Sequence, residues 1–571
     1  MILAARLLAA VAILLLVATD GFAGDRRDEI APPKRTKTNV VVILTDDQRW
    51  DTVVHATREI PPVRELMPVL ERELLNRGTT FLNAFATTPQ CCPFRASVLS
   101  GGFLPKDAGV LGNEPPNGGS SAFEVNDGET LPVLLQRAGY ATAMIGKYLN
   151  GYLSESAPRV PPGWDDFFVF RHSRWFRVRG IEGTSRDQPA TGHAVRRGEG
   201  YIIAAEGQAA LDFIGANASR PFFLWLALHA PHEPAEPETE EDLRIFRSFR
   251  FRGRAYGASH RKSDRIRALA ELYDRFEKDR PEQEAFARRQ LACLRGIDRV
   301  IDRLIGDLRR RKLLDSTVIV FASDNGYQWG EHGLFRKGLP YEESIRVPLA
   351  IAAPAAWGSR RPTDDHLVAA NLDLAATIRD IAGIHSGESQ GMSLLPLLTT
   401  DSKAWQRDAI VFQEFDSARR SWSAIRTSRW KYVEWGSTGE RELYDVASDP
   451  YETRNLAREP RLATEIASLR PRLELDRGLG VVERNLPSAS LGKAFHHELR
   501  AWGGRQPYRW TVQEGPMPPG LALDPSGVIA GTPTRAGSFE LSVGVQAAST
   551  RRFTHRPETF VARIVIQVKG K

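Results

Sequence analysis

The sequence predicts an α/β fold, with a large, mainly parallel sheet sandwiched by helices. Two continuous apolar runs, at residues 39–44 (NVVVIL) and 316–322 (STVIVFA), are rich in β-branched side chains and have the length of single strands. Such runs are typical of strands buried on both faces, as in parallel sheets between helix layers. Between them strand-like and helix-like segments alternate, which favours one doubly covered sheet.

The other elements of this domain follow from local patterns. Helices are expected at 68–77, 131–138 and 204–214, and strands at 141–145 and 221–228. From 282 to 312, apolar residues recur at helical spacing with arginines opposite them. This pattern predicts a long amphipathic helix packed on the sheet.

A chain of 571 residues is longer than a single core usually supports, so smaller domains are expected beside the large one. The α/β domain is assigned to 38–395. At 396–480 the pattern changes to short alternating segments closed by a helix at 463–475, which predicts a small antiparallel α+β subdomain. The alternating segments lie at 409–413, 422–426, 430–433 and 442–445.

A separate module is expected at 485–571. The stretch 518–533 (PPGLALDPSGVIAGTP) alternates short apolar segments with Gly and Pro turns, which fits a small β-sandwich. It resembles the immunoglobulin-like repeats of bacterial extracellular proteins, in a single copy. Glycan or cell-wall binding and a plain spacer role are both open.

Residues 1–23 have the shape of a secretory signal peptide. Arg6 precedes an apolar run at 7–18, and small residues precede a cleavage point after Ala23. The run is short for a membrane-spanning helix, so we expect a secreted protein without a stable membrane anchor. Residues 24–37 are polar and are expected to be flexible.

The three cysteines, two of them adjacent, do not make a disulfide scaffold. Cys92 and Cys293 could pair, or both could be buried thiols. Cys293 falls on the apolar side of the long predicted helix, which favours two thiols.

Polar side chains follow both apolar runs where each strand should end. Asp46 and Asp47 follow the first run, and Asp324 and Asn325 follow the second. Open α/β sheets build their sites at the carboxyl ends of strands. These oxygen ligands suit a hard divalent cation, and calcium tolerates a crowded carboxylate cage better than magnesium. Zinc would need His or Cys, which these four positions do not offer.

Cys91, Pro93 and Arg95 form a Cys-x-Pro-x-Arg motif at the start of a helix-compatible run. The N-terminus of a helix has free backbone N–H groups and partial positive charge, so it suits an anion. Arg95 lies one helical turn beyond Cys91 and can face the same site. Taken alone, so short a motif favours a buried cysteine pair in a core turn.

Further signatures reverse that interpretation. Lys147 lies in GKYLN, His232 in PHEP and Lys337 in RKG. With the acids and the Cys91 motif, in this order, they resemble the sulfatase family of the alkaline-phosphatase-like superfamily over residues 38–476. The stretches GKYLN, CCP, DNGY and GEGY resemble in particular the branch that contains the N-acetylglucosamine-6-sulfatases.

The resemblance implies a sulfate ester hydrolase in which a formylglycine-generating enzyme oxidises Cys91 to formylglycine. The hydrated aldehyde would attack sulfur, and its second hydroxyl would then expel sulfate. The resemblance also implies one calcium ion per chain, bound by Asp46, Asp47, Asp324, Asn325 and the converted Cys91.

Roles for the basic residues follow from the same resemblance. Lys147 and Lys337 would bind sulfate oxygens, together with Arg95 beside the metal cage. His232 would protonate the leaving oxygen near neutral pH, while His229 is expected to be structural.

Three positions are less determined. Many arylsulfatases have histidine where this chain has Leu149, so the base for sulfate elimination is unassigned. Asn150 is a candidate hydrogen-bonding substitute. His332 could contact substrate or could only shape its loop.

The net charge of +7 and the pI near 9.3 favour acidic partners. Arginines alternate with aromatic residues shortly after His232, which would suit a polyanionic glycan and would suit nucleic acid too. These residues are Arg244, Phe246, Arg247, Phe249, Arg250, Phe251, Arg252 and Arg254. We expect a sulfated small molecule or glycan as substrate, and no nucleic acid.

Two alternative functions are open. A phosphodiester or phosphonate ester hydrolase would keep the fold, because relatives of that kind also use a converted cysteine. A non-catalytic glycan-binding protein would instead act through the module at 485–571.

Overall fold

The computed structural model describes residues 37–570, except for the segments 55–59, 153–159, 172–176, 184–193, 254, 257–265, 359–360, 386, 400–404, 416–420, 437, 477, 482–485, 503–504 and 551–556. The expected signal peptide at 1–23 lies outside the described residues, as does all but the last residue of the segment 24–37. No helix within the described ranges is both long and apolar enough to span a bilayer.

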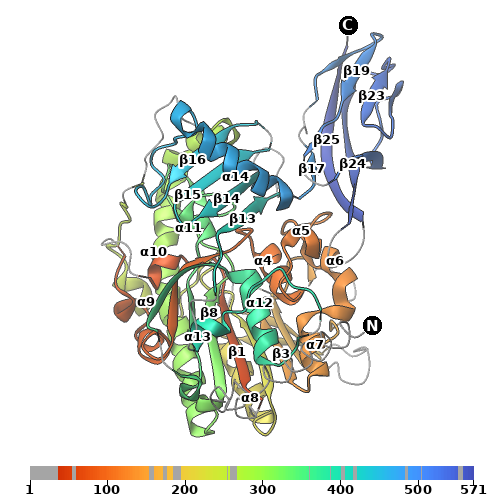
Figure 1. Ribbon diagram of the computed structural model, residues 1–571. Helices are drawn as coiled ribbons and strands as arrows, with labels where there is room; N and C mark the ends of the chain where they lie inside the picture. Colours follow the sequence, from red (N-terminus) through yellow and green to blue (C-terminus); the bar gives the residue numbers. More distant parts are fainter. Residues whose placement is uncertain are drawn as a thin grey trace, which may run out of the picture. The chain divides into compact units, whose positions relative to one another are not determined.

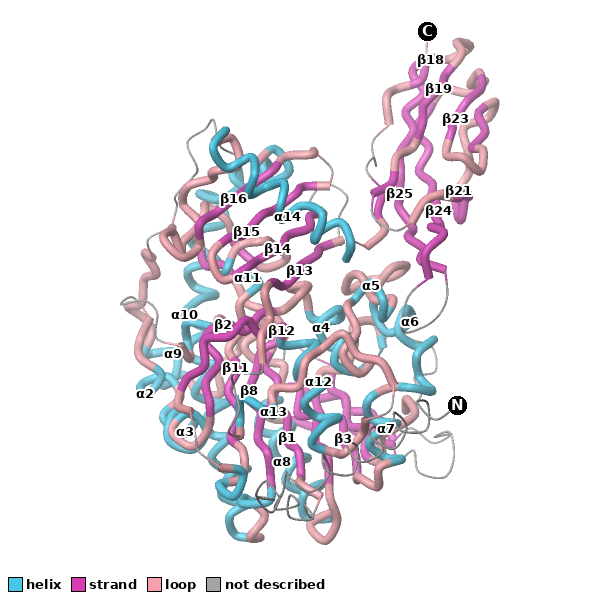
Figure 2. Tube along the Cα trace, in the orientation of Figure 1, coloured by secondary structure: helices cyan, strands magenta, loops and turns pink. Residues whose placement is uncertain are grey.

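The strands of the α/β domain are β1 (Asn39–Thr45), β2 (Thr79–Phe85), β3 (Ala141–Gly146), β4 (Asp166–Arg171), β5 (Arg177–Gly183), β6 (Ala194–Glu199), β7 (Phe222–Ala227), β8 (Thr317–Ser323), β9 (Gln328–Trp329), β10 (Phe335–Arg336), β11 (Leu349–Ala352) and β12 (Thr363–Ala369). All but β9 and β10, which pair with each other, form one ten-stranded sheet in the order β12-β2-β11-β8-β1-β7-β3-β4-β5-β6 (Figure 2).

The centre of this sheet is parallel, as predicted. The neighbours β8, β1, β7, β3 and β4 all run in one direction. Strand β11 runs against both of its neighbours, and β5 and β6 form an antiparallel edge. The sheet is therefore mixed, because reversed strands flank a parallel core.

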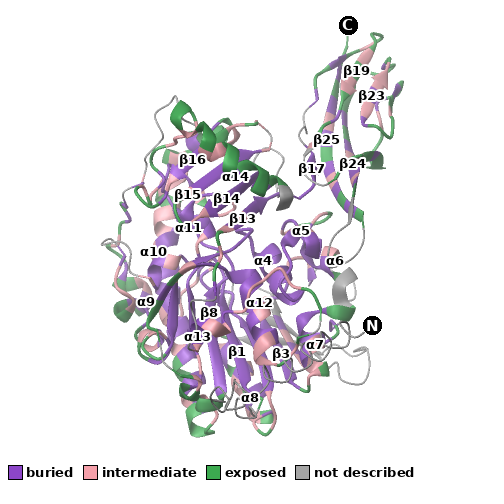
Figure 3. Cartoon of the chain, in the orientation of Figure 1, coloured by how far each residue is buried: buried purple, intermediate pink, exposed green. Residues whose placement is uncertain are grey.

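The helices of this domain are α2 (Val63–Leu66), α3 (Pro68–Leu70), α4 (Cys91–Leu99), α5 (Pro105–Ala108), α6 (Gly119–Phe123), α7 (Leu131–Arg137), α8 (Ile202–Ala216), α9 (Glu240–Ile245), α10 (Ala270–Arg310), α11 (Glu342–Ile345), α12 (Ala370–Ile381) and α13 (Leu395–Leu398). They cover both faces of the sheet (Figure 1). Val42 of β1 packs in a core with α4, α7 and α12, and Ile43 packs in a second core with α8 and α10. The central strands are buried throughout (Figure 3).

Two helices differ from their predicted bounds. Helix α10 begins at Ala270 rather than at residue 282 and continues through Pro281. Its added first part carries apolar residues at helical spacing, Leu272, Tyr273 and Phe276, but Pro281 follows them. A proline inside a helical pattern usually marks a helix boundary, so the sequence places the start of the helix too late. The helix expected at 68–77 is the short α3 followed by a π-helical turn, Glu71–Leu75.

The small subdomain is a four-stranded antiparallel sheet with one covering helix, as predicted. Its elements are β13 (Ala409–Glu414), β14 (Trp422–Thr427), β15 (Trp430–Trp435), β16 (Arg441–Asp445) and α14 (Ala463–Asp476). One face of the sheet packs on Leu469 and Leu473 of α14. The other packs on Leu339, Tyr341 and Ile345 of the α/β domain.

The C-terminal module consists of β17 (Gly480–Val481), β18 (Ala489–Ser490), β19 (Phe495–Glu498), β20 (Ala501–Trp502), β21 (Arg509–Glu514), β22 (Leu521–Leu523), β23 (Val528–Gly531), β24 (Gly537–Thr550) and β25 (Pro557–Lys569). A four-stranded sheet, β18-β25-β24-β21, and a three-stranded sheet, β19-β23-β22, account for most of these strands. Burial alternates along β25, which is the pattern of a strand with one buried face. The predicted β-sandwich class of this module is confirmed.

Candidate active site

Four adjacent parallel strands end at the same place. Asp46 and Asp47 follow β1, Asp324 and Asn325 follow β8, and Lys147 follows β3. The turn that carries His232 follows β7. Because these strands are neighbours in the order β8-β1-β7-β3, their carboxyl ends bring together side chains that lie far apart in the sequence.

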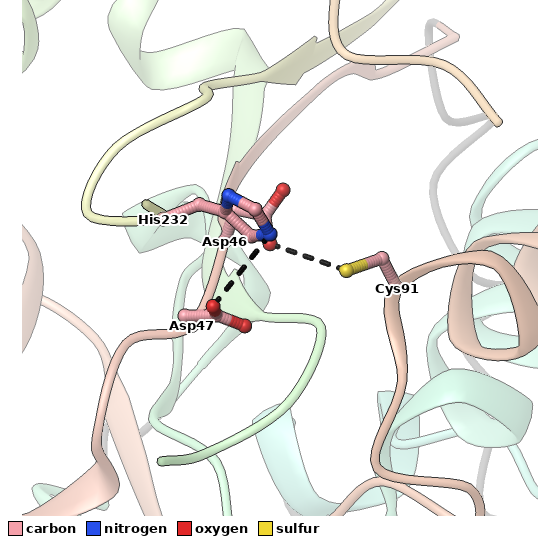
Figure 4. A group of neighbouring side chains, drawn as sticks. All are labelled: Asp46, Asp47, Cys91 and His232. Atoms are coloured by element: carbon pink, nitrogen blue, oxygen red, sulfur yellow. Dashed lines mark hydrogen bonds and ion pairs between the residues drawn. The ribbon is translucent and has the colours of Figure 1, made fainter. Parts of the chain in front are cut away.

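Cys91 is the first residue of α4 and lies against these strand ends (Figure 4). Its Sγ is 3.4 Å from Asp46 Oδ1, 2.9 Å from Lys337 Nζ and 3.4 Å from Lys147 Nζ. Burial and the charge of Asp46 raise the pKa of the Cys91 thiol to about 12, although both lysines act in the opposite direction. The unmodified side chain is therefore a neutral thiol at physiological pH and a poor nucleophile.

The two lysines pair with the two acids of the β1 end. Lys147 forms an ion pair with Asp46, and Lys337 forms one with Asp47. Burial alone would raise the pKa of Asp46, but Lys147, His232 and other nearby basic side chains outweigh it and hold that pKa well below its usual range. Asp46 is thus a carboxylate although it has no exposed surface.

Arg95 connects the acids of two strands. Its Nε and Nη2 donate to Asp324 Oδ2 at 2.9 and 2.8 Å, and Nη2 also donates to Asp46 Oδ2 at 3.3 Å. Burial and the charge of Asp46 raise the pKa of Asp324 to about 6 even beside this guanidinium. Arg95 also donates to the carbonyl of Lys147. The position one turn beyond Cys91 therefore faces the acids, as the helical spacing predicts.

The donor set fits a divalent cation. Asp46, Asp47, Cys91 and His232 each offer one ligand atom within 4.8 Å of the others (Figure 4). Asn325 Nδ2 donates to Asp47 Oδ1 at 2.6 Å, and its buried Oδ1 has no hydrogen-bond partner among the described residues. A buried amide oxygen that lacks a hydrogen-bond partner and lies beside carboxylates is suited to bind a metal ion. The thiol and the imidazole are donors that zinc also accepts, whereas the carboxylate and amide oxygens are ligands that calcium prefers.

His232 lies at the open side of this group. Its Nε2 is 3.8 Å from Asp47 Oδ2, and its side chain is about one third exposed. Nδ1 is 2.8 Å from the carbonyl of Glu233, which only accepts, so Nδ1 carries the hydrogen. Nε2 is then the nitrogen that gains or loses a proton. Burial and Lys147 lower the pKa of His232, although Asp46 and Asp47 oppose this shift.

Comparison with known proteins gives the family. The family model "Sulfatase" matches residues 38–384, which is more than half of the chain. The chain belongs to the sulfatase family. The model "N-sulphoglucosamine sulphohydrolase, C-terminal" matches residues 330–477, and the model "Putative Ig domain" matches residues 481–564.

Similar sulfatases include two animal proteins. The chain is 30% identical over 397 residues to a human N-acetylglucosamine-6-sulfatase, a match that covers 66% of this chain and 67% of that protein. It is 29% identical over 377 residues to an extracellular sulfatase Sulf-1 homolog of Caenorhabditis elegans. That match covers 64% of this chain but only half of the nematode protein.

Solved structures show the same fold. A protein in complex with its substrate D-glucosamine-2-N,6-O-disulfate has a TM-score of 0.63 and 24% identity, with 77% of this chain and 97% of that chain covered. A phosphonate monoester hydrolase of Agrobacterium radiobacter has a TM-score of 0.56 and 20% identity, covering 76% and 96%. The alkaline-phosphatase-like architecture expected for a sulfatase is confirmed.

The two candidate substrate contacts, His332 and Asn150, form no hydrogen bond with Cys91 in the part of the chain that the structure describes. His332 has no exposed surface, stacks on Tyr341 at 4.2 Å and lies 3.7 Å from Glu343 Oε2. These contacts favour a role in shaping its loop over contact with substrate. Asn150 lies beside Cys92, whose Sγ accepts from Asn150 N at 2.8 Å. Among the hydrogen bonds and ion pairs of the described residues, none joins Asn150 to the acids or lysines of the site.

Sequence reasoning missed the side chains that hold the Lys337 segment. Trp422 Nε1 on β14 donates to Gly338 O at 3.0 Å, and Lys431 Nζ on β15 donates to Pro340 O at 2.8 Å. Gln90, the residue before Cys91, donates to Glu414 Oε1 at 3.0 Å. These contacts join residues more than 80 positions apart, and no local pattern marks them. The small subdomain therefore supports the site from one side.

Two further expectations have clear outcomes. Cys92 and Cys293 are both free and buried, so the preference for thiols is confirmed. In the arginine-rich strip, Phe246 and Phe251 are each only 4% exposed and Phe251 packs on Trp329, so these two rings belong to the core, and glycan binding by the strip stays a prediction. Arg254 lies outside the described residues.

Proposed function

We propose that this sulfatase is a secreted sulfuric ester hydrolase that cleaves sulfate from a sulfated sugar or glycan. The observation that carries the proposal is the position of Cys91, whose Sγ at the start of α4 lies within 3.4 Å of both Lys147 Nζ and Lys337 Nζ. Two ammonium groups and a helix N-terminus around one side chain suit a tetrahedral anion held for attack.

Cys91 would be converted to formylglycine by a formylglycine-generating enzyme during maturation, and its hydrated aldehyde, polarised by one calcium ion, would supply the nucleophilic oxygen. Lys147 and Lys337 would bind the sulfate oxygens and the charge that spreads over them. His232 would donate the proton of Nε2 to the leaving oxygen. Burial of the acids and of Cys91 would keep water away from the reacting atoms.

The names of two relatives support the proposed substrate class and secretion. The name of the human relative, N-acetylglucosamine-6-sulfatase, supports a glucosamine 6-sulfate unit as substrate. The nematode relative is named an extracellular sulfatase, which agrees with the signal-like sequence at 1–23 and supports secretion.

The test uses the full chain, coexpressed with a formylglycine-generating enzyme. Sulfate release from 4-nitrocatechol sulfate and from N-acetylglucosamine 6-sulfate is measured by ion chromatography, next to phosphate ester cleavage on bis(4-nitrophenyl) phosphate. Mass spectrometry of the Cys91 peptide gives the extent of conversion, and elemental analysis gives the bound metal.

We expect sulfate release that tracks the converted fraction, about one calcium per chain, and loss of turnover after chelation. The matched control is Cys91→Ala, which should fold and be inactive because only the nucleophile is lost. Full activity in this variant, or faster cleavage of the phosphodiester than of either sulfate ester, would overturn the proposal. The second outcome would assign the chain to phosphodiester hydrolysis.

A further inference from the structure

The turn at residues 228–235 carries His232 into the site directly after β7 ends. Several backbone bonds hold it there; among them, Asp46 N donates to Ala230 O at 3.2 Å, and His232 N donates to His229 O at 3.1 Å. The second bond makes His229 the anchor of His232. A group that holds His229 therefore also restrains the position of His232.

Glu206 on α8 holds His229 at two points. Its Oε1 lies 2.5 Å from His229 Nδ1, and its Oε2 accepts from the backbone N–H of His229 at 3.4 Å. Glu206 has no exposed surface, and His229 is 7% exposed. A carboxylate that binds both the ring and the backbone of one residue restrains its position and its rotation together.

The backbone around this pair is unusually close. Gly146, the residue before Lys147, has a φ of +103°, and a Cβ there would lie 3.2 Å from Glu206 Oε1 and 2.0 Å from Ala227 O. The carboxylate thus packs against the backbone that leads to Lys147. A side chain at this position would push apart the ends of β3 and β7, both of which lead into the site.

Stability alone does not account for such a pair. Removing a carboxylate from water costs several kcal/mol, and a well-packed apolar pair in its place is often as stable or more stable. What an apolar pair does not provide is the directional restraint on His229. The presence of a carboxylate at position 206 is therefore explained by the geometry that it imposes on His229.

We propose that Glu206 is a positioning residue for leaving-group protonation: through His229 it fixes the turn from which His232 reaches the leaving oxygen. This inference rests on the proposed function, in which His232 donates that proton. Glu206 itself touches neither substrate nor the reacting atoms.

The leaving group provides the test. A good leaving group such as 4-nitrophenolate departs without a proton, whereas an alkyl or sugar alkoxide needs one. The variant Glu206→Gln keeps the shape but presents an NH₂ group where one acceptor oxygen stood. We expect it to slow sulfate release from N-acetylglucosamine 6-sulfate by about 10- to 100-fold and from 4-nitrophenyl sulfate by less than about threefold. Across a series of aryl sulfates, the plot of log kcat/KM against leaving-group pKa should become steeper.

Two further variants bracket this result. His232→Ala sets the limit for complete loss of protonation, and the slope for Glu206→Gln should lie between this variant and the unaltered protein. Asp298→Asn is the matched control, because Asp298 is a 5% exposed carboxylate on α10 that accepts from the backbone of Val69 and Leu70, away from the turn. Any loss in this control should be equal for all leaving groups.

An unchanged slope in folded Glu206→Gln, or an equal loss on every substrate, would overturn the inference. If Glu206→Gln does not fold, Glu206→Asp replaces it, because it keeps the charge on a shorter side chain. A slope for Glu206→Asp equal to that of the unaltered protein would then overturn the inference. If the unaltered protein releases no sulfate at all, the proposed function has failed instead. Hydrogen–deuterium exchange then decides: peptide 228–235 should exchange faster in Glu206→Gln than in Asp298→Asn, and equal exchange would overturn the positioning role.

Discussion

Arg95 shows how one side chain can set the geometry of several others. Its guanidinium donates to Asp324 and Asp46 and to the carbonyl of Lys147, and it is 1% exposed. The planar guanidinium group can make these bonds at the same time, whereas a lysine ammonium group is a point charge that cannot make all of them. Arg95 therefore orients the carboxylates proposed to bind calcium.

We predict that Arg95→Lys lowers the affinity for calcium by about 10- to 100-fold, which is typical when a group that orients metal ligands is lost. Titration of chelator-treated protein with calcium measures the effect. The control is Arg299→Lys, since Arg299 pairs with Glu238 and Asp242 and is 42% exposed at its side chain. Unchanged calcium affinity with reduced turnover would mean that Arg95 acts on the substrate instead.

At the scale of residues, the sequence predicts the site residues that belong to a motif, but it does not predict the side chains that hold them in position. Cys91 and Arg95 stand in one short motif, and the acids stand at the ends of recognisable strands. Glu206 and Trp422 stand in no such pattern. Their partners, His229 and Gly338, are 23 and 84 positions away, and only the folded chain brings them together. Long-range hydrogen bonds of this kind leave no periodicity in the sequence.

The element that presents Lys337 is a segment with little regular structure of its own. It is bonded to strands of the small subdomain through Trp422 and Lys431. Lys431 is fully buried and also pairs with Glu342 and Glu452, so these strands form a rigid backing. The subdomain thus positions a lysine of the site as well as closing the fold.

We predict that Trp422→Phe lowers kcat/KM for sulfate esters by about tenfold, because displacement of a reacting group by about 1 Å can cost up to about 100-fold. The fold should lose only about 1 kcal/mol, the value of one hydrogen bond. Steady-state kinetics and urea unfolding measure the two effects. Trp405→Phe is the control, because its indole donates to Ser393 O at 2.8 Å, outside the Lys337 segment. Equal kinetic losses in both variants would contradict the positioning role of Trp422.

At the scale of elements, the sequence predicts strands and helices that have a clear period. The runs at 39–44 and 316–322 are strands, and the four segments of the subdomain pair as expected. The reversed direction of β11 could not be predicted, because a buried strand has the same apolar pattern whether it runs parallel or antiparallel to its neighbours. The start of α10 was missed because Pro281, which lies inside the helix, indicates a helix boundary in the sequence.

At the scale of the whole molecule, the charges of the site are nearly balanced, whereas the chain carries a net charge of +7. At the site, Asp46, Asp47 and Asp324 face Lys147, Lys337 and Arg95, so charges nearly balance there. The excess of +7 over the chain must therefore lie elsewhere. The order of the ten strands is also a property of this scale: β1 pairs with strands that lie about 180 and 280 residues further along the chain, and no sequence pattern specifies those partners.

The net charge leads to a prediction about substrate size. A polyanionic glycan extends beyond the site and feels the field of the whole protein, whereas a small aryl sulfate feels mainly the buried cations. Salt screens exposed charges with a Debye length of about 10 Å at 0.1 M, and it screens buried pairs much less. Between 50 and 200 mM NaCl we expect kcat/KM to fall about tenfold for a 6-sulfated glycan and less than about twofold for 4-nitrocatechol sulfate. Equal loss on both substrates would place the salt effect in the site itself, and no loss on the glycan would mean that the net charge does not recruit it.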